Sequence, residues 1–123
     1  MPAVTKTFSV DWGQGITPSL LNVHLQALMP VLDQLWDTMG LSYFEVVRDG
    51  QLFIFRFVAG NGRIWAQTAH VDVPGGELRL STQGLEDEWT LLEINTIRSA
   101  REKFMAFMLS VNASRITCAY GVS

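Results

Sequence analysis

Three hairpin turns in a row constrain the fold of this chain more than any other feature of its sequence. Asp49-Gly50, Asn61-Gly62 and Pro74-Gly75-Gly76 separate segments that are rich in Phe, Val, Ile and Trp. Short turns that contain glycine, placed between such segments, are typical of β-hairpins. The sequence therefore predicts a four-stranded antiparallel meander over about residues 42–82.

A long helix is predicted ahead of the meander. Thr17 followed by Pro18 is typical of a helix start, and Gly40 is typical of a helix end. Between these positions, leucines recur every three or four residues and form one apolar stripe. Pro30 lies inside this stripe. Because proline cannot donate a backbone hydrogen bond, we expect it to kink or split the helix.

A second long helix is predicted over residues 86–111, and alternating residues predict outer strands over 5–12 and 115–122. The expected order is strand, helix, four strands, helix, strand, or β-α-β-β-β-β-α-β. We therefore expect an α+β fold in a single domain over residues 1–123. Its antiparallel sheet would have five or six strands, with the two long helices packed on one face.

The turns also predict which side chains share a face of the meander. A two-residue turn at Asn61-Gly62 would place Ala66 opposite Phe57, on the face beneath the helices. The other face is then too apolar to be freely solvated, because polar residues should dominate such a face. We expect residues of this second face to bind a partner: Tyr43, Leu52, Ile54, Arg56, Trp65, Gln67 and Val71.

Surplus apolar surface is the main functional signal in the sequence. Two helices can cover one face of the sheet but not both, so we expect a non-enzymatic protein-binding domain. It would dimerise or engage another protein, as an adaptor, a chaperone-like protein or an immunity-like protein does. The alternative is a small-molecule binder or minor enzyme with an aromatic pocket between helices and sheet. That pocket would be lined by Phe53, Phe55, His70 and Trp89.

Composition argues against several classes of function. The net charge is −3 and the pI is about 5.2, whereas proteins that bind nucleic acids or anionic membranes usually carry a basic patch. The chain shows no secretory signal and no run of about 18 apolar residues, so we expect a cytoplasmic protein. Cys118 is the single cysteine and is expected to be a small buried side chain.

No arrangement of residues predicts a catalytic site. His70 and Asp72 could form a general base, but no nucleophile lies near them in the sequence, so a hydrogen-bonded histidine is favoured. His24 and His70 lack the spacing of metal ligands. Gly13-Gln14-Gly15 precedes a helix, as phosphate-binding loops do, but a strand-to-helix connection explains both glycines. We therefore predict no catalytic residue, no metal ligand and no cofactor.

Overall fold

The computed structural model describes residues 3–72, 77–83 and 88–122. Its elements follow the predicted order, so the predicted α+β fold is confirmed. The elements are β1 (Val4–Asp11), α1 (Pro18–Met39), β2 (Leu41–Asp49), β3 (Leu52–Ala59), β4 (Ile64–Asp72), β5 (Glu77–Gln83), α2 (Leu91–Ser110) and β6 (Arg115–Val122).

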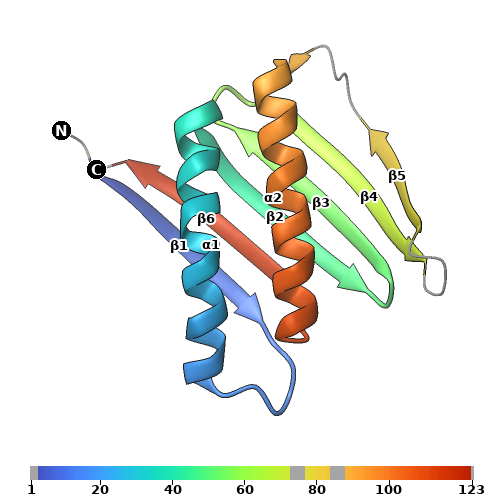
Figure 1. The fold of residues 1–123 in the computed structure, drawn as a ribbon. Coiled ribbons are helices and arrows are strands. Elements are labelled where there is room, and N and C mark those ends of the chain that lie inside the picture. The colour runs from blue at the N-terminus through green and yellow to red at the C-terminus, as the bar shows by residue number, and fades with distance from the viewer. Residues whose placement is uncertain (1–2, 73–76, 84–87, 123) are drawn as a thin grey trace.

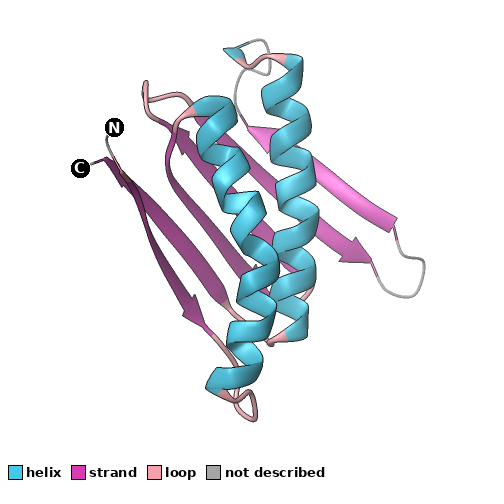
Figure 2. Ribbon diagram, turned by 60° about the vertical axis from the view of Figure 1, so that its left-hand side comes forward, coloured by secondary structure: helices cyan, strands magenta, loops and turns pink. Residues whose placement is uncertain are grey.

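All six strands form one antiparallel sheet in the order β1-β6-β2-β3-β4-β5 (Figure 1). The last strand, β6, lies between β1 and β2, so the first and last strands of the chain are neighbours in the sheet. Figure 2 shows both helices on the same face, side by side. The opposite face, called the open face below, carries neither of the two described helices.

Helix α1 begins and ends where the sequence predicts. The Thr17 hydroxyl accepts a hydrogen bond from the Leu20 N–H at 3.2 Å, which caps the first turn. Gly40 ends the helix in the left-handed conformation, with φ of 58°. The helix runs through Pro30 without a break, so it is not split there. Pro30 lies on the exposed side, while Leu28 before it and Val31 after it are buried and hold both halves of the helix on the core.

Helix α2 begins five residues later than predicted, at Leu91 instead of residue 86. Thr90 is the cap: its hydroxyl accepts from the Glu93 N–H at 3.1 Å, and the Glu93 carboxylate accepts from the Thr90 N–H at 2.9 Å. This reciprocal capping box satisfies two donors at the helix end and therefore fixes the start of the helix. Residues 86 and 87, where the helix was predicted to begin, lie outside the described residues.

The strand pairing of the first hairpin is shifted by two residues from the predicted pairing. Asp49 pairs with Leu52, so the turn is Gly50-Gln51 instead of Asp49-Gly50. Because successive side chains on a strand alternate between faces, a shift of two residues keeps every side chain on its predicted face. The third predicted turn, Pro74-Gly75-Gly76, lies outside the described residues.

The strand pairing of the second hairpin is shifted by one residue from the predicted pairing. This shift reverses the faces of β4. Val58 pairs with Ile64, so an odd number of residues, 59–63, separates these two paired positions. The Ala59 N–H donates to the Arg63 carbonyl at 2.9 Å, and Gly62 has a φ of 89°. A three-residue loop with a left-handed glycine is a favoured alternative to the two-residue turn expected from the sequence. The prediction for β4 was therefore wrong.

The core lies between the helices and the sheet. Phe44 is at its centre, and its ring stacks on Phe104 of α2 with ring centroids 4.6 Å apart. Trp65 of β4 points into this layer and is only 2% exposed, with its ring perpendicular to that of Trp89. The adjacent Ile64 points to the open face and is 43% exposed. The exposure of these two side chains therefore depends directly on the register of the second hairpin.

Trp65→Ala should lower the free energy of unfolding by about 4 kcal/mol, because it leaves a large cavity in the core. Ile64→Ala, one residue away, should lower it by less than about 1 kcal/mol, because that side chain already contacts solvent. Urea denaturation of both variants measures the difference. A larger loss for Ile64→Ala than for Trp65→Ala would contradict the register.

Candidate functional site

A patch of aliphatic side chains lies in the middle of the open face. Ile54 of β3 is 41% exposed and Ile64 of β4 is 43% exposed. The strand pairing continues the patch to β2, because Val47 is opposite Ile54. The apolar patch consists of Val47, Leu52, Ile54, Val58 and Ile64. A hollow of about 80 Å³ opens between β3 and β4 beside Ile54, Ala66 and Thr68.

Polar residues border this patch on the side of β1 and β6. The exposed side chains of β1 on this face are Thr5, Thr7 and Ser9, and Thr117 of β6 is opposite Ser9. An apolar centre with a polar border is the arrangement found in protein–protein interfaces. Among the described side chains of the open face, those in its middle have this character, so the candidate site is centred on β3.

Arg56 lies within the patch, between Ile54 and Val58 on the same face of β3. The pairing places Glu45 directly opposite, but the Glu45 carboxylate accepts from Arg115 at 3.0 Å and 2.5 Å. The hydroxyl of Tyr43 also donates to Glu45, at 3.4 Å. The hydrogen bonds to Glu45 are the main cause of a raised pKa for Arg115.

Glu45 is therefore committed to Arg115, and among the described side chains Arg56 forms no ion pair. An exposed guanidinium surrounded by aliphatic groups offers a carboxylate both a charge and a fixed set of donors. The patch thus combines an apolar contact surface with the available positive charge of Arg56.

Four of the residues predicted to bind a partner lie on the open face: Tyr43, Leu52, Ile54 and Arg56. Trp65 and Gln67 do not, because the reversed register of β4 turns them toward the helices, where they are 2% and 5% exposed. Val71 also packs against the core. For these three residues the predicted place was wrong, and the cause is the odd-numbered connection of the second hairpin.

Gln67 instead takes part in a buried polar contact under α2. Its amide oxygen accepts from Arg101 Nη1, and Arg101 is only 4% exposed. Burial is the main cause of a lowered pKa for Arg101. Because a buried polar group without a partner is costly, Gln67 is needed where it lies and is not available to a partner protein.

The alternative aromatic pocket is not assembled. Phe53 and Phe55 are 1% and 0% exposed and pack in the core, and Trp89 is also buried. His70 lies on the open face, opposite Leu52, because it follows the reversed alternation of β4. The sheet therefore separates His70 from the three aromatic residues, and the predicted common pocket was wrong.

A cavity lies elsewhere, at the end of the sheet where three loops meet. It has a volume of about 420 Å³, and Asp11, Trp12 and Arg48 contribute to its wall. Arg48 donates to the Gly50 carbonyl at 3.0 Å and to the Asn112 side chain at 3.3 Å. Small-molecule binding stays a prediction, and this cavity is a better place for it than the aromatic core.

The glycine pair before α1 has a structural explanation at this same end. A Cβ atom on Gly13 would lie 2.6 Å from the side-chain nitrogen of Asn112, so any other residue there would force that side chain to move. Gly15 has a φ of 86°, a conformation that other residues rarely adopt. Both glycines therefore serve the connection between β1 and α1, as the sequence analysis favoured.

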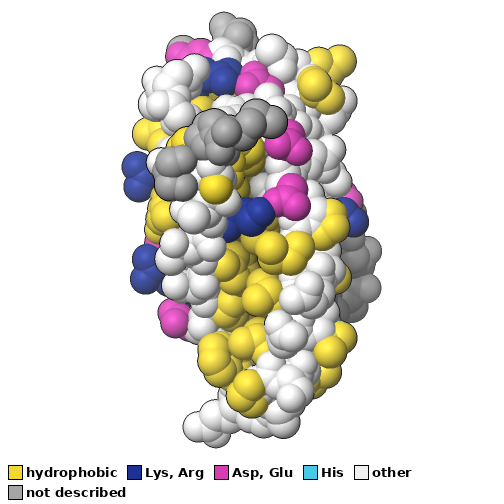
Figure 3. Space-filling view, turned by 90° about the vertical axis from the view of Figure 1, so that its left-hand side faces the viewer, with side chains coloured by type: hydrophobic (Ala, Val, Ile, Leu, Met, Phe, Trp, Pro, Cys, Tyr) yellow, Lys and Arg dark blue, Asp and Glu magenta, His cyan; other side chains and the backbone are white. Residues whose placement is uncertain are grey.

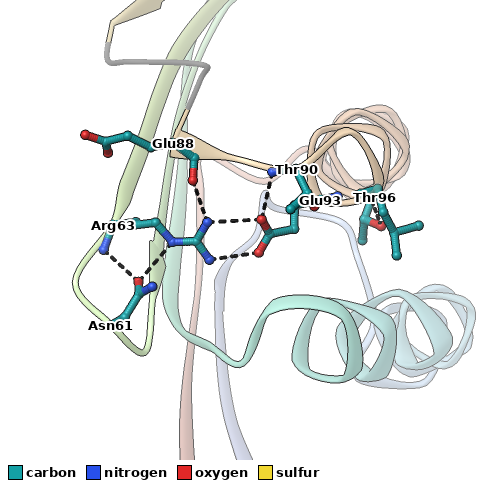
Figure 4. Close-up of polar contacts among 7 residues, drawn as sticks. Asn61, Arg63, Glu88, Thr90, Glu93 and Thr96 are labelled. Atoms are coloured by element: carbon teal, nitrogen blue, oxygen red, sulfur yellow. Dashed lines mark hydrogen bonds and ion pairs between the residues drawn. The ribbon is translucent and has the colours of Figure 1, made fainter.

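A polar cluster that sequence analysis missed joins the second hairpin to α2 (Figure 4). The Arg63 guanidinium donates to both oxygens of Glu93, at 3.0 Å and 2.8 Å, and to the Glu88 carbonyl at 2.7 Å. Its Nε donates to the Asn61 side chain at 3.1 Å, and the guanidinium lies 4.4 Å from the Trp89 ring centre. The Thr-x-x-Glu spacing of the capping box was the available sequence signal.

This cluster has a structural role, because its contacts are made within the chain. The hydrogen bond from Arg63 is the main reason why the pKa of Glu93 falls to about 2, against the opposing effect of burial. A carboxyl group with a lowered pKa in the folded state stabilises that state above its unfolded pKa of about 4.5. The stabilisation is lost as the pH falls toward 2.

Glu93→Gln should lower the free energy of unfolding by about 2 kcal/mol at pH 7. The difference from the unchanged protein should shrink between pH 4.5 and pH 2, where the carboxylate becomes protonated. Urea denaturation at pH 7, 5 and 3 measures this trend, with the exposed Glu102→Gln as the control. A difference that stays constant with pH would contradict the assigned ion pair.

Other candidate chemistry finds no support in geometry. Cys118 is fully buried, and burial is the main reason why its pKa rises to about 11, so its thiol is unreactive near neutral pH. Within the described ranges, no three His, Cys, Asp or Glu side chains gather as a possible metal site. Neither described helix combines the length and the apolar character needed to cross a membrane. No family model, curated protein or solved structure matches this chain.

Proposed function

We propose that this chain is a non-enzymatic protein-binding domain that engages another protein through the open face of its sheet. One observation carries the proposal: both helices lie on the opposite face, and the apolar patch remains in contact with solvent. Burying such a patch contributes about 25 cal/mol for each Å² of apolar surface removed from water.

The chemistry of the partner follows from Arg56. A partner that covers the patch removes water from this guanidinium, and the loss of hydration is offset only if the partner supplies an acceptor. The partner surface is therefore apolar with a carboxylate near its centre. A second copy placed with Arg56 facing Arg56 would fit poorly, because two like charges would meet and the neighbouring Glu45 is already bound to Arg115.

The biological role of this chain depends on which protein it binds. Adaptor, chaperone-like and immunity-like roles would all use such a face, and the choice among them stays a prediction, as does the cytoplasmic location expected from the sequence. The apolar patch with Arg56 inside it is common to all three roles.

Selection of a phage-displayed random peptide library tests the proposal. On the unchanged protein, enriched peptides should combine apolar residues with Asp or Glu. On Arg56→Glu the enriched peptides should carry Lys or Arg instead, because the charge at the centre is reversed. Binding of peptides from either selection should be lost in Ile54→Glu, which keeps an exposed position but makes it charged.

The controls separate the possible failures. Thr117→Glu changes charge on the polar border and should leave the selected peptides bound. If no peptide is enriched, or if enriched peptides still bind Ile54→Glu, the open face is not the binding surface. If Ile54-dependent peptides lack acidic residues, the role assigned to Arg56 is wrong.

A further inference from the structure

The edge of the sheet at β1 offers a second surface, distinct from the open face. β1 has eight residues and pairs with β6 along one side only. Every second N–H and C=O group of an edge strand points away from the sheet and can pair with another strand. This edge is therefore a surface that an extended segment could join through backbone hydrogen bonds.

An apolar groove runs along this edge. Figure 3 shows hydrophobic side chains in a strip between β1 and α1, interrupted by a basic and an acidic side chain. Phe8 and Val10 of β1 and Leu25 and Met29 of α1 are only partly buried, although they pack against the core. A strand added beside β1 would place alternate side chains over this strip.

The alignment of β1 with α1 follows from one ion pair. Lys6 of β1 contacts Asp33 of α1, and the two elements run in opposite directions (Figure 1). Two residues along a strand span about 6.6 Å and four along a helix about 6 Å, so Phe8 lies near Met29 and Val10 near Leu25. The groove is therefore continuous beyond Lys6, along Phe8 and Val10.

We propose that β1 pairs antiparallel with β1 of a second copy, around a twofold axis at Thr7. On the side away from the helices this pairing joins Thr7 to Thr7 and Thr5 to Ser9 of the other copy. Threonine and serine pairs of this kind stabilise antiparallel strands. On the helix side it joins Val4 to Val10 and sets the alkyl chain of Lys6 along the Phe8 ring of the other copy.

The strand is thus complementary to itself, and this favours a second copy over other extended segments. No like charges lie opposite each other in this register, because Lys6 and Asp11 are the only charged residues of β1. An inward-pointing charge can block pairing at an edge strand. Here Asp33 of the same copy neutralises Lys6, so this obstacle is removed.

The pairing would join two sheets into one, with the helices of both copies on one side and both open faces on the other. This inference does not rest on the proposed function, because β1 and the apolar patch lie in different parts of the sheet. Ile54→Glu should leave the pairing unchanged, which distinguishes the failure of one proposal from the failure of the other.

Single cysteines test the pairing directly. Thr7→Cys should form a disulfide-linked dimer under mild oxidation, because residues opposite each other at the axis have Cα atoms about 5 Å apart. Thr5→Cys, on the same face of β1, should not, because its two copies would lie about 13 Å apart. The native Cys118 does not interfere, because it is fully buried. Dimers from Thr5→Cys but not from Thr7→Cys would overturn the proposal.

Charge substitutions at the axis provide the matching test in solution. By light scattering over a concentration series, Thr7→Lys and Thr7→Asp should each dimerise at least about threefold more weakly than the unchanged protein. An equal mixture of the two variants should recover dimers, because opposite charges then meet at the axis. A monomeric unchanged protein at every concentration, or a dimer that neither variant weakens, would overturn the proposal.

Discussion

A sheet has two faces, and each apolar face must be removed from water by something. In this chain both helices lie over one face, where the rings of Phe44, Phe57 and Phe104 form the centre of the core. The polar and ionic contacts described above hold that layer in place, as the Arg63–Glu93 pair does at the start of α2. Because both helices lie on one side, the open face remains uncovered. The functional proposal depends on this uncovered face.

The order of elements could be predicted because its signals are local. Thr17, Pro18 and Gly40 mark the ends of α1 through their own backbone preferences, and the structure uses them in that way. The face of β4 could not be predicted, because it depends on whether an even or an odd number of residues separates the paired positions of β3 and β4. Asn61-Gly62 is compatible with both, and only the pairing of Val58 with Ile64 decides between them.

The register of β4 also explains which of the predicted partner-binding residues were placed correctly and which were not. Residues of β2 and β3 kept their predicted face, so Ile54 and Arg56 remain candidates for partner binding. Trp65 and Gln67 moved into the core. The ion pair of Glu45 with Arg115 could not be predicted either, because it requires β6 beside β2. Nothing in the local sequence indicated that position for the last strand. Contacts between residues 70 positions apart depend on topology, and topology has no local signal.

Thiol labelling of neighbouring positions on β3 tests most directly whether the open face is uncovered. Ile54→Cys should react with a thiol reagent under native conditions nearly as fast as an unfolded chain does. Phe55→Cys, one residue away and facing the helices, should react at least about a hundredfold more slowly, because labelling then requires local opening. If the thiol at position 54 is protected as strongly as that at position 55, another part of the chain covers the open face. The central claim would then be wrong.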